Sequence, residues 1–251
     1  MEWDDWQTRV WRGKVAAIAR AVIPTGFDEL DRHLPGGGWP IGAVIEIFID
    51  DYGVGELALL MPALTALTKA DPAKPQKWVA WIAPPFVPYA PALQQHGVDI
   101  DRLLMIHPTA GHKSRLWAIE QVVRSGSSAG VLAWVAAADD IALRRLQLAA
   151  EDQACWVLLF RPASARQQRS PAALRIRLSR SEAAARVEII KCRGGRPGVV
   201  DIAGLGLGES ERSFEARARA GMPAVEQCTE QLPTRAGTPA VEQCTEQLPS
   251  Q

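Results

Sequence analysis

The sequence predicts an α/β domain built on a mixed, mostly parallel β-sheet flanked by helices. Short, continuously apolar runs alternate with helix-like segments of about 10–15 residues, which is typical of βαβ units and a parallel sheet. Residues 174–193 instead alternate apolar with charged side chains, which is typical of half-buried antiparallel strands. A parallel sheet with an antiparallel edge accounts for both patterns.

The expected elements follow one another along the chain. A short helix with Thr25 as its N-cap precedes a glycine turn at 36–38. The apolar strands are expected at 44–49, 78–83, 103–107, 130–135 and 156–160, followed by the alternating strands 174–180 and 185–193. The helices between them are expected at 56–69, 89–96, 114–125 and 139–152, with a kink at Pro62 and a cap at Asp139 or Asp140.

The pattern divides the chain into three parts. Residues 1–20 read as an amphipathic helical arm, residues 21–204 as the core, and residues 205–251 as a disordered tail. The tail carries PAVEQCTEQLP twice, at 223–233 and 239–249, within a duplicated 16-residue segment. The repeat is interpreted either as a recent duplication of DNA or as a pair of short docking motifs.

Composition favours a cytoplasmic protein without a metal. No apolar run approaches the roughly 18–20 residues of a membrane span, and the start MEWDDWQTRVW has no apolar signal segment. The 4 cysteines and 4 histidines show no spacing typical of metal ligands, so reduced thiols and no metal site are expected.

The stretch IEIFIDDYGVGEL, residues 45–57, resembles a phosphate-binding loop without its chemistry. A working loop reads G-x-x-x-x-G-K-[ST], in which the Lys contacts phosphates and the hydroxyl holds magnesium. Here Gly53 and Gly55 form the turn, but Glu56 and Leu57 follow them. A carboxylate repels a triphosphate and Leu offers magnesium no oxygen, so no ATP in the usual mode and no cofactor are expected.

Longer strings resemble bacterial RecA recombinases. They are IPTGFDELDRHLPGGGWPIGAVIEIF (23–48), HGVDIDRLL (96–104) and VEIIKCR (187–193), in the family's order across residues 22–198. This resemblance implies a RecA-like domain of the P-loop NTPase type.

The same resemblance implies that the ATPase groups are missing. The positions that match the family's phosphate-binding Lys and Thr, water-activating carboxylate, magnesium-associated Asp and nucleotide-sensing Gln are, in that order, Glu56 and Leu57, Pro85, Val135, and Arg161 with Pro162. Phosphoryl transfer depends on positioned charge, so four losses in a retained scaffold imply a pseudo-ATPase rather than an enzyme.

Within RecA-like proteins, the chain more closely resembles the ImuA family of translesion DNA synthesis accessory proteins. The strings that carry this resemblance are PGGGWP, GELALLMPAL, WVAWIAPPFVPYAPAL, LWAIEQVVRSG, RRLQLAAE, LLFRPASA, SPAALRIRL and VEIIKCRGG. It implies a protein of the bacterial DNA-damage (SOS) response that assembles the mutagenic translesion complex. The implied partners are ImuB, a polymerase-like scaffold, and an error-prone replicative-type polymerase subunit.

Two regions are candidates for further contacts. A basic strip between Arg161 and Arg196 holds ten basic residues, and RecA proteins carry a mobile DNA-binding loop at its start. The resemblance therefore points to Arg161, Arg166 and Arg169 as DNA phosphate contacts, although a solvated strand face is the alternative. In the arm, Trp3, Trp6 and Trp11 are candidate contacts to ImuB, to another copy or to RecA, or else pack on their own domain.

Two other functions stay open on the sequence. A cell-division inhibitor resembling SulA shares part of this RecA-like fold and would block polymerisation of the tubulin-like division protein. An ATP-dependent recombinase-like protein would hydrolyse ATP through an unorthodox loop, without Lys and Thr at positions 56 and 57.

Overall fold

The computed structural model describes residues 21–70, 75–108, 111–181, 184–203 and 205. All of them belong to the first of the two units, Met1–Ser210 and Glu211–Gln251, into which the chain divides. The expected arm and almost all of the expected tail therefore lie outside the described residues, as do Trp3, Trp6 and Trp11.

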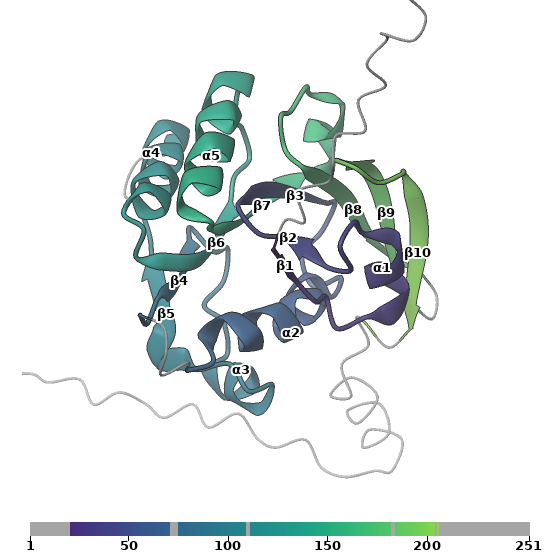
Figure 1. Cartoon of the computed structure of the whole chain (residues 1–251), viewed down its shortest axis with the longest axis horizontal. Helices are drawn as coiled ribbons and strands as arrows, with labels where there is room; N and C mark the ends of the chain where they lie inside the picture. Colours follow the sequence, from purple (N-terminus) through teal and green to yellow (C-terminus); the bar gives the residue numbers. More distant parts are fainter. Residues whose placement is uncertain (1–20, 71–74, 109–110, 182–183, 204, 206–251) are drawn as a thin grey trace, which may run out of the picture. The chain divides into compact units, whose positions relative to one another are not determined.

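A sheet of eight strands organises the described residues (Figure 1), in the order β10-β9-β8-β3-β7-β6-β4-β5. The strands are β3 (Ala43–Ile49), β4 (Trp78–Ile82), β5 (Leu103–Ile106), β6 (Ser128–Trp134), β7 (Trp156–Pro162), β8 (Leu174–Arg180), β9 (Ala184–Cys192) and β10 (Gly198–Ala203). All pairs from β8 across to β5 are parallel, while β9 pairs antiparallel with β8 and β10. The expected mixed, mostly parallel sheet with an antiparallel edge is confirmed.

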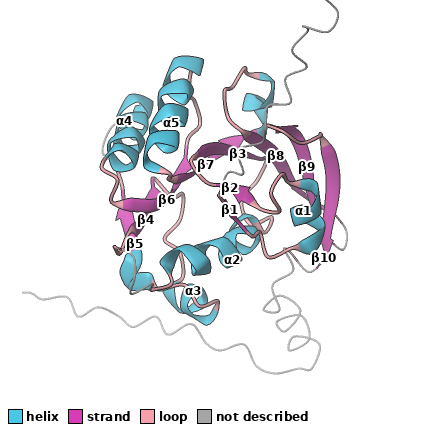
Figure 2. Cartoon of the chain, in the orientation of Figure 1, coloured by secondary structure: helices cyan, strands magenta, loops and turns pink. Residues whose placement is uncertain are grey.

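Helices cover both faces of this sheet (Figure 2). They are α1 (Asp28–His33), α2 (Glu56–Thr68), α3 (Ala90–Gln95), α4 (Gly111–Arg124) and α5 (Asp140–Gln153), with 3-10 turns η2 (Ile100–Arg102) and η3 (Ala163–Gln167). A small separate sheet pairs β1 (Val22–Ile23) with β2 (Trp39–Pro40). Leu60 and Leu64 of α2 join one apolar cluster, while Leu143 and Leu146 of α5 join another.

Strand β3 lies in the middle of the sheet, and all seven of its residues are buried. Its odd-numbered isoleucines, Ile45, Ile47 and Ile49, belong to the cluster that contains α2, and Val44 belongs to the cluster that contains α4 and α5. Because successive strand residues point to opposite faces, a strand covered on both faces is expected to be apolar at nearly every position. The one charged residue in this strand is Glu46.

The sequence signals for helix N-caps were correct for α5 and wrong for α1. Asp139 caps α5 as expected, because its Oδ1 accepts the N–H of Ala142 at 2.7 Å. Thr25 does not cap α1, which begins at Asp28 after Phe27. Its hydroxyl oxygen instead accepts the N–H of Phe27 in a tight turn.

The proline in α2 does not interrupt the helix. Pro62 stands inside Glu56–Thr68, and its ring lies against Gly26, which has φ +84°. A Cβ built on Gly26 would lie 2.5 Å from Cγ of Pro62, so only glycine fits there.

The basic strip folds differently from the expectation. Strands β8 and β9 do form an antiparallel pair, but β8 also pairs in parallel with β3 on its other side. Arg175 of β8 is consequently buried rather than solvated. Strand β10, Gly198–Ala203, was not expected from the sequence.

Candidate functional site

The turn between β3 and α2 keeps the shape of a strand-to-helix loop. Gly53 and Gly55 have φ of +85° and +94°, and Gly55 stands at the N-cap of α2. Residues other than glycine rarely adopt these backbone conformations, so the two glycines explain the sharp turn. Leu57, the second residue of α2, packs partly buried against the apolar cluster on that face.

The side chain of Glu56 closes this turn. Its two carboxylate oxygens accept the backbone N–H of Gly53 at 3.0 and 3.1 Å, and the residue is buried. A negative charge is stabilised at the N-terminus of a helix, where the first N–H groups have no helical partner. The loop therefore holds an anion that belongs to its own chain.

A pocket of about 430 Å³ opens beside this loop, at the carboxyl ends of β3 to β7. In open α/β sheets this edge is the usual place for a ligand, and the volume lies within the range of small ligand sites. All four positions expected to have replaced ATPase groups beyond the loop, namely Pro85, Val135, Arg161 and Pro162, line it. The loop residues Gly53, Gly55, Glu56 and Leu57 do not.

The wall of the pocket combines aromatic and other apolar side chains with charged ones. The indole of Trp134 stacks on the ring of Phe160 with centroids 4.8 Å apart. The ring of Trp81 is tilted against that of Trp134, with centroids 5.7 Å apart. Three residues that line the pocket have a buried donor without a hydrogen-bond partner among the described residues: Nε1 of Trp134, Nε of Arg115 and Nε of Arg161. Buried donors normally have an acceptor, so these atoms mark where a ligand acceptor could bind.

Charge on the pocket wall is divided between two sides. Asp50 and Asp51 follow β3, and Asp50 accepts Nη2 of Arg177 at 2.7 Å. Arg115 of α4 and His107, which follows β5, lie among the other lining residues. In the part of the chain that is described, no group of three or more acidic, histidine or cysteine side chains could hold a metal.

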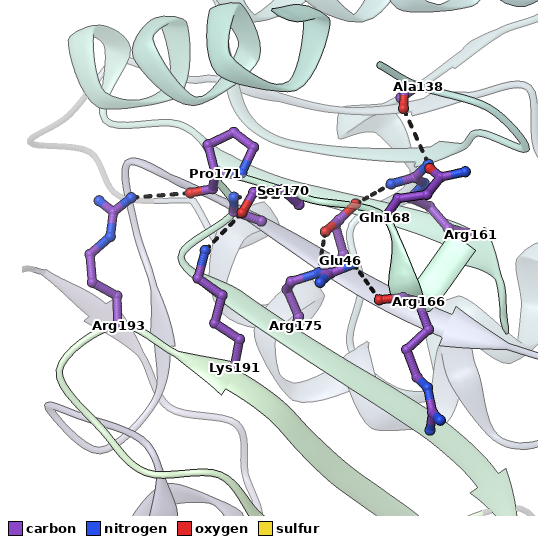
Figure 3. A network of polar contacts seen from close by, with 11 residues as sticks. Glu46, Ala138, Arg161, Arg166, Gln168, Ser170, Pro171, Arg175, Lys191 and Arg193 are labelled. Carbon is purple, nitrogen blue, oxygen red and sulfur yellow. Dashed lines mark hydrogen bonds and ion pairs between the residues drawn. The ribbon is translucent and has the colours of Figure 1, made fainter. Parts of the chain in front are cut away.

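A buried ionic network (Figure 3) is joined to the pocket through Arg161, which lines the pocket. Glu46 of β3 accepts Nη1 of Arg161 at 2.5 Å and Nε of Arg175 at 2.7 Å, and the side chains of Glu46 and Arg161 are 0% exposed. The guanidinium of Arg175 also lies over the ring of Phe48, 4.9 Å from its centroid. The sequence contained one signal of this network that we missed, a single Glu within the apolar run VIEIFI.

The network also fixes the segment that follows β7. Four cationic side chains donate hydrogen bonds to atoms of residues 166–171. They come from β7, β8, β9 and the residue that follows β9. The bonds are Arg161 to Oε1 of Gln168 (2.7 Å), Arg175 to the carbonyl of Arg166 (3.0 Å), Lys191 to that of Ser170 (2.8 Å) and Arg193 to that of Pro171 (3.1 Å). Burial, followed by the nearby charges of Arg193 and Arg175, lowers the pKa of Lys191.

These contacts correct the expected DNA contacts. Arg161 is wrong as a phosphate contact, because its guanidinium is buried and paired with Glu46. Arg166 is partly exposed and pairs with Glu188 at 3.4 Å. Arg169 is exposed, and no ion pair joins it to another described residue. Much of the basic strip is neutralised within the fold, since Arg175, Arg177, Arg186 and Arg193 also have acidic partners.

Comparisons with known proteins leave the site to be interpreted on its geometry. The sequence matches no protein-family model, and no curated protein matches it at the level taken as significant. Among the described helices, none has both the length and the apolar character needed to cross a membrane.

Proposed function

We propose that this chain is a non-catalytic, RecA-like accessory protein of the bacterial DNA-damage (SOS) response in the cytoplasm. In this proposal it assembles the mutagenic translesion complex with ImuB and an error-prone polymerase subunit. The fold is α/β with a large, mostly parallel sheet, which is compatible with the RecA-like class. The resemblance of the sequence to the ImuA family supplies the partners.

The observation that carries the proposal is the internal anion at the loop. Glu56 uses its carboxylate to bind the N–H of Gly53, within the turn where a phosphate-binding loop would hold phosphate. A triphosphate would meet a negative charge there instead of a lysine. This supports a domain that no longer uses ATP.

The pocket supports the same conclusion. Phosphoryl transfer requires a positioned base, a magnesium ligand and cationic groups around the phosphates. Pro85, Val135 and Pro162 carry no ionisable group, and Arg161 is already bound to Glu46. None of these four positions therefore supplies a free base, a magnesium ligand or a free cation to a bound nucleotide.

The test measures ATP binding, ATP hydrolysis and ImuB binding with the same purified chain. We expect no saturable heat on titration with ATP and MgCl₂, no release of phosphate, and stable co-purification with ImuB. The variant Glu56→Lys/Leu57→Thr restores the loop residues and is expected to remain without turnover, because the base and the magnesium ligand are still missing. Magnesium-dependent, saturable ATP binding by the wild-type chain would overturn the proposal.

Contact with DNA is proposed only for the exposed cations. Arg166 and Arg169 are the remaining candidates, and contacts of this kind weaken as salt rises. Replacing both with Ala should reduce the dependence of oligonucleotide affinity on salt, by a slope of about one per phosphate contact. An unchanged slope would remove DNA from the proposal.

A further inference from the structure

Four large side chains are exposed to solvent in the two loops that contribute Tyr52, Pro84 and Pro85 to the pocket. Tyr52 follows β3, and Phe86, Val87 and Tyr89 belong to the loop after β4. Their exposed fractions are 50%, 70%, 88% and 73%. We call these four residues, three of which are aromatic, the aromatic rim. Exposed apolar groups gathered in one place often mark an interaction site, because burying each of them against a partner stabilises the complex.

The rim is organised before any partner binds. The rings of Tyr52 and Phe86 meet edge to face with centroids 5.9 Å apart, although they belong to different loops. Pro84, Pro85 and Pro88 stand within the second loop and restrict its backbone. A loop that is already ordered loses less conformational entropy when it binds.

The rim is continuous with the pocket. Tyr52, Pro84 and Pro85 line the pocket, and so do the stacked rings of Trp134 and Phe160. A partner that covers the rim can therefore insert a side chain against these aromatic rings. An anchor side chain in a pocket with apolar contacts around it is the usual arrangement of an interface hot spot.

Charge identifies the class of partner. Asp51 is exposed beside Tyr52 and forms no ion pair within the described part of the chain, while Arg115 on α4 has a buried Nε that lacks an acceptor. A nucleic acid strand stacked on the rim would bring its phosphates close to the carboxylate of Asp51, where like charges repel. A polypeptide can instead present a cation, an apolar anchor and a carboxylate in one short segment.

We propose that the aromatic rim and the pocket dock an extended segment of a partner protein. In this segment a basic residue faces Asp51, a large apolar side chain enters the pocket, and a carboxylate meets Arg115. The proposal rests on the proposed function in one respect, which is that it takes ImuB as the partner that supplies the segment. It thereby assigns a binding role to the surface around the replaced ATPase positions.

The first experiment measures the affinity of the full chain for purified ImuB. The variant Phe86→Ser/Val87→Ser should bind at least about 30-fold more weakly, as expected for a hot spot worth about 2 kcal/mol or more. Asp51→Lys should also weaken binding. The matched control is Val199→Ser, since Val199 is 55% exposed on β10 at the edge of the sheet opposite β5. Thermal unfolding of each variant checks that the fold is intact.

Each result has a defined meaning. Loss of affinity in the rim variant with an unchanged control supports the inference, and equal affinity of all variants overturns it while the proposed function stands. A rim variant that keeps ImuB but loses a fluorescent single-stranded oligonucleotide overturns it in favour of nucleic acid.

A second measurement tests the surface without ImuB. Short peptides with lysine, tryptophan and glutamate in that order, and with the two charges exchanged, are titrated into labelled protein and followed by NMR. We expect chemical-shift changes at Tyr52, Phe86 and the indole N–H of Trp134, and larger changes with the first peptide than with the second. If wild-type protein does not bind ImuB, the proposed function fails, and this titration still decides the inference. Absence of shifts at the rim overturns it.

Discussion

The variant Glu46→Gln should destabilise the protein strongly. Glu46 has no solvent exposure and binds Arg161 and Arg175 through both carboxylate oxygens. Removing the negative charge leaves two guanidinium groups in the interior with only neutral acceptors, the side chain of Gln168 and backbone carbonyls. Breaking one buried ion pair costs about 3–5 kcal/mol, so we expect a loss at or above this range.

Chemical and thermal unfolding measure this loss. For a domain of this size, about 3–5 kcal/mol corresponds to a fall in Tm of roughly 6–20 °C. The matched control is Glu188→Gln, because Glu188 pairs with Arg166 at the surface, where both side chains are 39% exposed. Surface pairs contribute about 0–1 kcal/mol.

An apolar replacement separates charge from packing. The triple variant Glu46→Leu/Arg161→Met/Arg175→Leu removes all three charges together and should recover much of the stability lost in Glu46→Gln, as replacements of buried ion networks often do. If Glu46→Gln lost no more than Glu188→Gln, the network would contribute no more than a surface pair, and our reasoning would be refuted.

Three other residues, Glu56, Gly26 and Cys155, give the remaining predictions. Glu56→Ala removes the acceptor for the N–H of Gly53 and should lower the free energy of unfolding by about 1–2 kcal/mol in urea; no change would show that the contact is absent in solution. Gly26→Ala places a methyl group 2.5 Å from Cγ of Pro62 at positive φ and should cost at least about 2 kcal/mol, whereas a stable variant would contradict the close packing. Burial raises the pKa of Cys155 from 9.0 to about 12, so alkylation at pH 8, followed by mass spectrometry, should be about a thousandfold slower than for a free cysteine. Because the unfolded chain loses this proton first, the free energy of unfolding should also fall as pH rises above about 9, and rapid alkylation would contradict both expectations.

Periodicity predicted the parallel half of the sheet well for a physical reason. Strands covered on both faces are mostly apolar, as β3 and β7 are apart from the ion-paired Glu46 and Arg161, and such runs are visible in the sequence. The cap at Asp139 is also local, since the donor lies three residues away. The prediction of a cap at Thr25 was wrong because its hydroxyl accepts a hydrogen bond within a tight turn instead. The sequence does not distinguish such a turn from a helix cap.

The ionic network could not be predicted in the same way. Glu46 meets Arg175 because β8 pairs with β3 in a particular register, across 129 residues of sequence. Alternation in β8 correctly marked Leu174, Ile176 and Leu178 as buried, and it wrongly implied that Arg175 is solvated. Alternation specifies two faces of a strand, but it does not specify whether the second face is covered.

The candidate site was predicted in part. The sequence marked Pro85, Val135, Arg161 and Pro162 as related positions through a family resemblance, and the structure brings all four to one pocket. The aromatic rim was not identified, because exposure of Phe86 and its contact with Tyr52 depend on two loops that meet only in the fold.

The central position of β3 has a consequence for how the chain is made. Its two neighbours, β7 and β8, begin at Trp156 and Leu174, so β3 leaves the ribosome more than a hundred residues before either partner. At about 5–20 residues per second, this strand waits roughly 6–26 s with its backbone groups unpaired. During that interval an exposed apolar strand is open to incorrect pairing. Chaperone binding should therefore be strong for nascent chains halted after β3 has emerged and before β7 has, and it should end once β8 has emerged.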